Sequence, residues 1–182
     1  MDVHRQSSLS LIDKPSYAGG EKEVRTCMKI LLLSDSHGNL GPARRILAAE
    51  QPDMVLHLGD LQPDAQRLRA EFPALEWHSV PGNCDGQTDA PAVMLLQREG
   101  CRIFGTHGHL HGVKWSLLRL RMAAQEQQAQ VAAFGHTHQP YCEYVDGVWL
   151  LNPGSCQRDA CYALIELNGG APACSLHRLP NA

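Results

Sequence analysis

The chain has 182 residues, of which 43% are hydrophobic and 19% charged, and its formal net charge is -3 at pH 7. This composition is ordinary for a single globular domain, and the charge gives no support for binding to nucleic acid or to an anionic membrane surface. No apolar run reaches the ~18 residues that cross a bilayer. The chain has seven cysteines, an odd number, and none of them forms a Cys-x-x-Cys motif, which favours reduced thiols in a cytoplasmic protein.

Residues 1–27 differ from the rest of the chain in being polar, without periodicity, and interrupted by Pro15 and the pair Gly19-Gly20. They lack the apolar segment of a secretory signal and carry too many acidic residues for a typical mitochondrial transit peptide. We therefore expect a disordered N-terminal extension over residues 1–27 and a single domain over residues 28–182. An ordered arm is the alternative, and Met28 is an alternative initiator.

The first half of the domain alternates between strands and helices. Four consecutive apolar residues, Ile30 to Leu33, predict a buried strand that ends abruptly at Ser34-Asp35. The elements expected after it are a helix over 40–50, a strand over 54–58, a helix over 64–71 and a strand over 76–80. This alternation predicts a parallel sheet.

The second half is richer in strands. The expected elements are a hairpin of strands 92–97 and 101–106, a helix over about 114–128, a strand over 131–134, a hairpin of strands 141–145 and 148–151, and closing strands over 162–167 and 174–179. Asp146-Gly147 is a typical hairpin turn. This number of strands favours two sheets over one. Two histidines inside the predicted strands, His57 and His78, are expected to be packed or hydrogen-bonded.

Polar side chains follow five of the predicted strands, at the edge where open α/β sheets build their sites. They are Asp35, His37, Asp60, Asn83, His107, His136 and His138. Each short motif alone could be an ordinary turn, but turns do not explain all five together. Hard oxygen and imidazole ligands select Mn²⁺, Fe, Zn²⁺ or similar ions over soft thiolate-bound metals.

Seven potential ligands exceed the needs of one four-coordinate ion. Two ions that share a bridging carboxylate would use all of them. A pair of metals about 3.5–4 Å apart is suited to in-line attack at phosphorus by a bridging hydroxide. The sequence therefore predicts a dinuclear site for phosphate-ester hydrolysis.

The ordered motifs Asp-x-His, Gly-Asp, Gly-Asn-x-Asp, a histidine after a strand, and Gly-His-x-His resemble the signature of the calcineurin-like metallophosphoesterases. The variants Gly-Asn-Cys-Asp, Thr-His-Gly-His and Asn-Pro-Gly-Ser resemble the YfcE-type phosphodiesterase branch, which is related to the Vps29-like scaffold proteins. The resemblance extends from Met28 to about Leu179. It implies an α/β fold, a four-layer α/β/β/α sandwich of two mixed sheets, with a dinuclear site at the strand ends.

The resemblance also implies roles for individual residues. The first metal would be held by Asp35, His37 and His138, the second by Asn83, His107 and His136, and Asp60 would bridge both. The expected ions are two divalent transition metals, Mn²⁺ first, with Fe, Zn or Ni as alternatives. Catalytic roles fall to Asp60, Asn83, His109, which would line the site, and Asp85, which would orient the Asn83 loop. Asn39 and Arg158 would contact phosphate; a turn former and a surface charge are equally open interpretations.

Cys84 stands where many phosphomonoesterases of this superfamily have a histidine that protonates the leaving oxygen. The general acid is therefore open among His109, His111 and water. We expect a metal-dependent phosphodiesterase that acts on a small phosphodiester substrate, with a homo-oligomer left open. The alternatives are a Vps29-like, non-catalytic, metal-binding interaction scaffold and a phosphomonoesterase.

Overall fold

The structure, a computed structural model, describes residues 27–180, without the side chains of Arg158 and Asp159. The predicted extension over residues 1–27 therefore lies outside the described residues, apart from Cys27. None of the helices between residues 27 and 180 has the length and apolar character needed to span a membrane.

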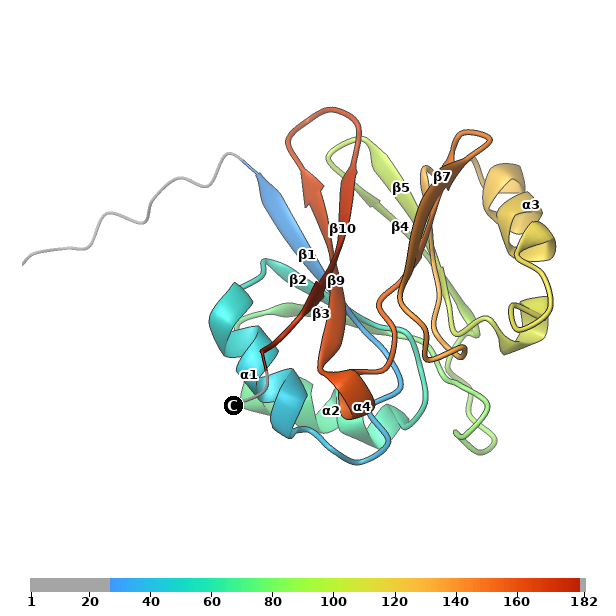
Figure 1. Ribbon diagram of the computed structural model, residues 1–182. Helices are drawn as coiled ribbons and strands as arrows, with labels where there is room; N and C mark the ends of the chain where they lie inside the picture. Colours follow the sequence, from blue (N-terminus) through green and yellow to red (C-terminus); the bar gives the residue numbers. More distant parts are fainter. Residues whose placement is uncertain (1–26, 181–182) are drawn as a thin grey trace, which may run out of the picture.

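The strands and helices follow the predicted order along the chain (Figure 1). The strands are β1 (Met28–Leu33), β2 (Met54–His57), β3 (Glu76–Ser79), β4 (Val93–Arg98), β5 (Cys101–Thr106), β6 (Val131–Ala133), β7 (Tyr141–Val145), β8 (Val148–Asn152), β9 (Cys161–Leu167) and β10 (Ala173–Arg178). The helices are α1 (Gly41–Glu50), α2 (Gln62–Glu71), the 3₁₀ turn η1 (His109–His111), α3 (Leu118–Glu126) and α4 (Cys156–Asp159).

Two mixed sheets of five strands each pack face to face. The first has the order β10-β9-β1-β2-β3, with β1, β2 and β3 parallel, and the second has the order β4-β5-β6-β8-β7, with β5, β6 and β8 parallel. Helices α1 and α2 cover the outer face of the first sheet and α3 covers the outer face of the second (Figure 1). The predicted four-layer α/β/β/α sandwich is confirmed.

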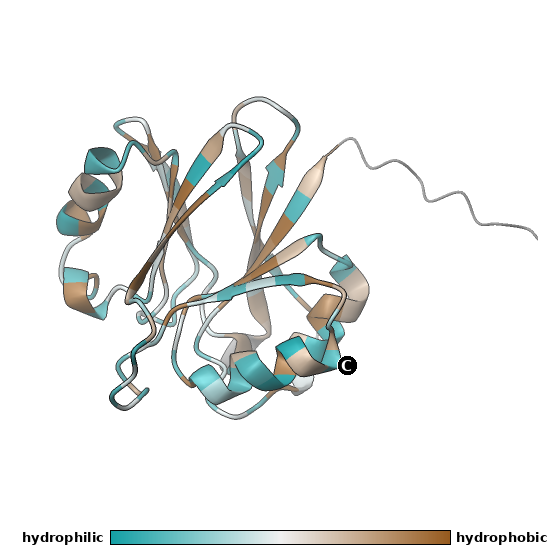
Figure 2. Ribbon diagram, turned by 180° about the vertical axis from the view of Figure 1, so that it is seen from behind, coloured by the Kyte–Doolittle hydropathy of each residue, from teal (hydrophilic) through white to brown (hydrophobic). Residues whose placement is uncertain are grey.

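The continuous apolar run in β1 is explained by burial on both faces. Ile30 and Leu32 belong to the core between the two sheets, whereas Leu31 and Leu33 pack with α1 and α2. All four side chains are at most 1% exposed. Figure 2 shows brown, hydrophobic segments along the inner strands of both sheets. A strand covered on both sides needs no polar alternation, which is why its sequence is apolar throughout.

The helix predicted over 114–128 is shorter than expected, because the 3₁₀ turn η1 and further turns occupy residues 109–117 and α3 begins only at Leu118. Gly112, with φ +65°, ends η1 in a left-handed conformation that a continuing helix cannot use. Leu118 and Met122 are about half exposed, whereas Leu120 and Ala124 are fully buried. Helix α4 was not predicted, because four residues are too few for a periodic pattern.

The two strand histidines behave as expected. His57 is buried at the end of β2, where its Nε2 lies 3.3 Å from Ser36 Oγ. His78 Nε2 lies 2.7 Å from Glu76 Oε1 on the same strand. The carboxyl ends of β1, β2, β3, β5 and β6 meet along the lower edge of the sandwich in Figure 1, where both sheets contribute loops.

Leu120→Ala and Leu118→Ala form a matched pair on α3. Leu120 is buried against the second sheet, so its truncation should lower the free energy of unfolding by about 2–5 kcal/mol. Leu118 is 51% exposed, so its truncation should change that free energy by no more than about 0.5 kcal/mol. Urea unfolding of both variants measures the difference, and equal losses would contradict the packing of α3.

Candidate metal centre

The site residues sit in loops with an unusual backbone conformation. Residues with positive φ among the predicted ligands are Asp35 (φ 55°), His37 (φ 42°), Asp60 (φ 58°), His136 (φ 68°) and His138 (φ 60°). Residues other than glycine rarely adopt this backbone region, although Asp and His tolerate it better than most. Such strained residues cluster at functional sites, where the surrounding fold holds them in position.

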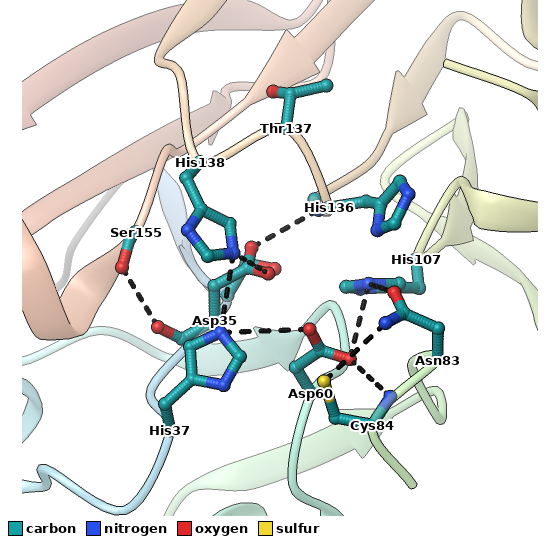
Figure 3. Close-up of polar contacts among 12 residues, drawn as sticks. Asp35, His37, Asp60, Asn83, Cys84, His107, His136, Thr137, His138 and Ser155 are labelled. Atoms are coloured by element: carbon teal, nitrogen blue, oxygen red, sulfur yellow. Dashed lines mark hydrogen bonds and ion pairs between the residues drawn. The ribbon is translucent and has the colours of Figure 1, made fainter. Parts of the chain in front are cut away.

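Four of the predicted ligands form one compact group. The ligand atoms of Asp35, His37, Asp60 and His138 all lie within 4.8 Å of one another. His138 Nε2 is 3.0 Å from Asp35 Oδ1 and 3.3 Å from His37 Nε2, and His37 Nε2 is 3.7 Å from Asp60 Oδ2 (Figure 3). This mixed oxygen and nitrogen donor set is the kind that Mn²⁺, Fe or Zn²⁺ accepts.

A second group surrounds the other oxygen of the same aspartate. His107 Nε2 lies 3.3 Å from Asp60 Oδ1 and 3.1 Å from Asn83 Oδ1. The opposite ring nitrogen, Nδ1, is 2.7 Å from the Leu58 carbonyl oxygen and must carry the proton that it donates. The other ring nitrogen, Nε2, faces Asn83 and Asp60 and is the one that a metal ion in this group would use. Fixing the tautomer through the other nitrogen is common in metal-binding histidines.

His136 joins the second group through ring contacts. Its ring centroid is 5.0 Å from that of His107 and 6.1 Å from that of His109. Burial, with the positive charge of Lys114 nearby, lowers the pKa of His136 to about 4, so its ring is neutral at pH 7. A neutral imidazole is the form that binds a metal.

Asp35 is a fully buried carboxylate whose two oxygens differ. Oδ2 accepts a hydrogen bond from the His136 backbone N–H at 3.2 Å, whereas Oδ1 lacks a hydrogen bond within the described residues. Burial raises the pKa of Asp35. Desolvating a carboxylate oxygen that accepts no hydrogen bond is costly, and a cation would offset that cost. The residues present therefore fit a divalent ion.

The Asp60 carboxylate, unlike Oδ1 of Asp35, accepts a hydrogen bond. Burial alone would raise the pKa of Asp60, but the Cys84 backbone N–H, which donates to Oδ1 at 3.0 Å, and the His107 ring hold it below its usual range. Gly82 allows this approach, because a Cβ there would lie 2.1 Å from Asp60 Oδ1. The carboxylate is therefore ionised at neutral pH and held between the two groups.

Asp64 was not predicted as a site residue, yet its carboxylate fixes the loop that carries His37. Asp64 Oδ2 accepts hydrogen bonds from Ser36 Oγ at 2.8 Å and from the Gly38 backbone N–H at 2.7 Å, so it grips the chain on both sides of His37. Asp64 is 2% exposed. Its position in the first turn of a helix made it look like an ordinary helix-start residue in the sequence.

The structure also locates the remaining predicted residues. Asp85 accepts hydrogen bonds from the Gly82 N–H at 2.8 Å and from the Gln62 N–H at 2.6 Å, and so ties the Asn83 loop to α2. Asn39 Oδ1 accepts from the Gly41 N–H at 3.3 Å, as a turn former does. Arg158 lies in α4, and its side chain is outside the described part of the chain.

The two candidate acid histidines point to different surroundings. The His109 ring lies 5.5 Å from His107, beside the second group. The His111 ring instead packs edge-on against Phe104, with centroids 5.7 Å apart. Burial lowers the pKa of both rings. Of the two, only His109 contacts the predicted ligands through the ring pairs within residues 27–180.

Comparison with known proteins shows the family of the chain. A family model, the calcineurin-like phosphoesterase superfamily domain, matches residues 28–170. A probable metallophosphoesterase of Bacillus subtilis, YsnB, is 36% identical over 152 residues, which cover 79% of this chain and 87% of YsnB. The phosphodiesterase YfcE of Escherichia coli is 29% identical over 154 residues, which cover 70% of this chain and 79% of YfcE.

Solved structures share the fold. A conserved protein of Streptococcus pneumoniae, described as a predicted phosphoesterase, superposes with a TM-score of 0.70 and 26% identity over 84% of this chain and 90% of that one. Vps29 of Entamoeba histolytica, solved with Zn²⁺, superposes with a TM-score of 0.64 and 21% identity over 83% of this chain and 99% of Vps29. The second likeness is one of fold.

Asp64→Ala should loosen the His37 loop, because Ser36 and Gly38 lose a common acceptor in a buried site. We expect the free energy of unfolding, measured in urea without added metal, to fall by about 1–3 kcal/mol. Asp89→Ala, at an exposed position, is the control and should change it by less than about 0.5 kcal/mol. An unchanged stability in Asp64→Ala would rule out the gripping role.

Proposed function

The chain belongs to the calcineurin-like phosphoesterase superfamily, and we propose that it is a phosphodiesterase that uses two divalent metal ions. One observation carries the proposal. The carboxylate of Asp60 directs Oδ2 toward His37 and the first group, and Oδ1 toward His107 and the second group. A carboxylate between two separate donor groups is what a bridging ligand requires.

In this proposal Asp35, His37 and His138 hold one ion, Asn83, His107 and His136 hold the other, and Asp60 contacts both. Hard oxygen and imidazole donors favour Mn²⁺, with Fe, Zn or Ni as alternatives. Bound there, such ions activate water and stabilise the negative charge that develops on the phosphoryl oxygens.

The hydrolysis breaks one ester bond. The oxygen of water forms a new bond to phosphorus, the P–O bond to one substituent breaks, and the departing oxygen takes up a proton. We assign to the neutral His109 ring, which contacts both His107 and His136, the donation of a hydrogen bond to the departing oxygen, and water supplies the proton. Asp85 acts indirectly, because it orients the loop that presents Asn83.

Cys84 does not suit proton transfer at neutral pH. Burial and the negative charge of Asp60 raise the pKa of its thiol, which keeps the proton bound. Many phosphomonoesterases of this superfamily have a histidine at this position to protonate the leaving oxygen, so Cys84 disfavours monoester hydrolysis. The relative named YfcE is a phosphodiesterase, which supports the same choice.

A non-catalytic scaffold is the second candidate, because Vps29 structures share this fold. Scaffolds can lose ligands without losing their role. Here seven candidate ligands are retained in the sequence, six of them in direct contact within the two groups and His136 beside them. We therefore favour the enzyme, formed by a single domain over residues 28–182.

Asp60→Asn tests the bridging role. The change keeps the size of the side chain but removes the charge that offsets two cations, so we expect turnover of bis-p-nitrophenyl phosphate to fall about 10³-fold. Metal analysis after dialysis should give two equivalents for the parent protein and fewer for the variant. Both readouts are needed, because a loss of activity alone would not separate the metal centre from general damage.

Cys84→Ala is the neighbouring control for that variant. A thiol that is neither ligand nor acid can be removed with activity retained within about tenfold, or ~1.4 kcal/mol of barrier. A parent protein that saturates with one metal equivalent, or an Asp60→Asn variant with near-parental turnover, would contradict the two-metal proposal. Faster turnover of p-nitrophenyl phosphate than of the diester would contradict the diesterase assignment.

His109→Ala and His111→Ala separate the two histidines of η1. His109 lies beside the second ligand group, so its loss should lower kcat about 10²-fold while metal content stays unchanged. His111 packs against Phe104, so its loss should change kcat less than about threefold. Equal effects of the two substitutions on kcat would argue against a catalytic role for His109.

A further inference from the structure

A pocket of about 440 Å³ adjoins the metal centre on the side of the second sheet. Thr137, which lies between His136 and His138, forms part of its wall. Val113 also lines it and packs against the backbone beside His107, because a Cβ at Gly108 would lie 2.8 Å from Val113 Cγ2. The pocket is therefore lined by neighbours of three candidate ligands, and its volume is in the range of small-molecule sites.

The wall of the pocket combines apolar and aromatic side chains with polar ones. Val113, Leu117 and Phe134 line it, together with the half-buried ring of Tyr141. The Phe134 and Tyr141 rings lie 6.4 Å apart at an angle of 58°. The hydroxyl of Tyr141 donates to Glu143, which anchors the ring from outside the pocket. Phe134 is almost fully buried behind Tyr141, so the half-buried ring of Tyr141 is the aromatic face on which a flat ring can stack.

The rim of the pocket is polar. Lys114 and Gln139 are exposed, and within residues 27–180 the Lys114 ammonium has no ion pair and the Gln139 side-chain amide has no hydrogen bond. Lys114 is also close enough to His136 for its charge to act on that ring. A pure hydrocarbon occupant would cover these groups without replacing their water, which carries a desolvation cost. An occupant with an aromatic face, polar edges and a nearby anionic group satisfies all of them.

From this geometry, and on the basis of the proposed diesterase function, we infer that the pocket binds a nucleobase carried by one substituent of the phosphodiester substrate. The base lies against Tyr141, Gln139 meets its polar edge, and Lys114 attracts the phosphate. The substrate class is therefore a nucleoside phosphodiester.

Two pairs of compounds that differ only in the base test the inference on the full, metal-loaded chain. Thymidine 5′-monophosphate and 2-deoxyribose 5-phosphate are compared for Kd by calorimetry. Thymidine 5′-(methyl phosphate) and 2-deoxyribose 5-(methyl phosphate) are compared for kcat/KM by chromatography of the products. We expect the base to improve both Kd and kcat/KM about tenfold, a modest gain for one stacked ring.

Tyr141→Leu should remove the preference for the base, bringing each pair to within about twofold. Tyr144→Leu is the matched control on the same strand, since Tyr144 is 60% exposed, lies outside this pocket and contacts Trp149, and it should leave the preference intact. Gln139→Ala should reduce the preference by about threefold. Because Gln139 is exposed, this variant should fold normally, so it tests the pocket even if Tyr141→Leu misfolds. Lys114→Gln should weaken both members of each pair equally, by about two- to fivefold, because it acts on the phosphate.

The outcomes separate this inference from the diesterase proposal. Base-dependent binding without turnover of either ester would sustain the pocket and overturn the diesterase. Turnover of both esters with equal kcat/KM and equal Kd would sustain the diesterase and overturn the pocket. Loss of the preference in Tyr144→Leu with its retention in Tyr141→Leu and Gln139→Ala would also overturn the pocket.

Discussion

The cost of burying carboxylates where two sheets meet is the constraint on which this structure depends. Asp35 and Asp60 follow neighbouring parallel strands and are at most 1% exposed. Asp60 receives a backbone hydrogen bond that keeps it charged, whereas Oδ1 of Asp35, 3.0 Å from the His138 ring nitrogen, accepts no hydrogen bond from residues 27–180. Isolated buried charge is costly, so such a pair persists where cations or donors compensate it. The surrounding histidines and amides are arranged around that requirement.

Backbone geometry follows from the same requirement. Several ligands must turn back toward a common point directly after a strand, and they do so with positive φ values, at a cost of about 1–3 kcal/mol for each strained residue. The glycines make room: a Cβ at Gly135 would lie 2.0 Å from Ser34 Oγ and 3.0 Å from Asp35 Oδ2. The apolar core between the sheets holds these loops against the strain, because it contains fully buried Ile, Leu and Val side chains from both sides.

The succession of strands along the chain and the polar residues at their ends could be predicted from the sequence, because a buried strand followed by Ser-Asp or Gly-Asp leaves a local pattern. The grip of Asp64 on the His37 loop could not, because it joins residues 26 to 28 positions apart and leaves no motif. The start of α3 was also missed: apolar residues near Leu117 fit a helical period, but a left-handed Gly112 ends η1 before the helix can form. The phosphate contact predicted for Asn39 stays a prediction. In the structure the Asn39 side chain accepts a hydrogen bond from the Gly41 N–H within its own turn.

The first ligand group draws on both halves of the sandwich, since Asp35, His37 and Asp60 follow strands of the first sheet and His138 follows β6 of the second. An ion held there would be bound by residues of both sheets and would link the sheets at the edge where these strands end. Binding to the native state alone stabilises a fold by about 2.7 kcal/mol when the free ion is at 100 times its Kd. The supply of metal in the cell would then govern how long the chain survives proteolysis as well as how fast it works, and a metal-starved cell would hold less of the protein.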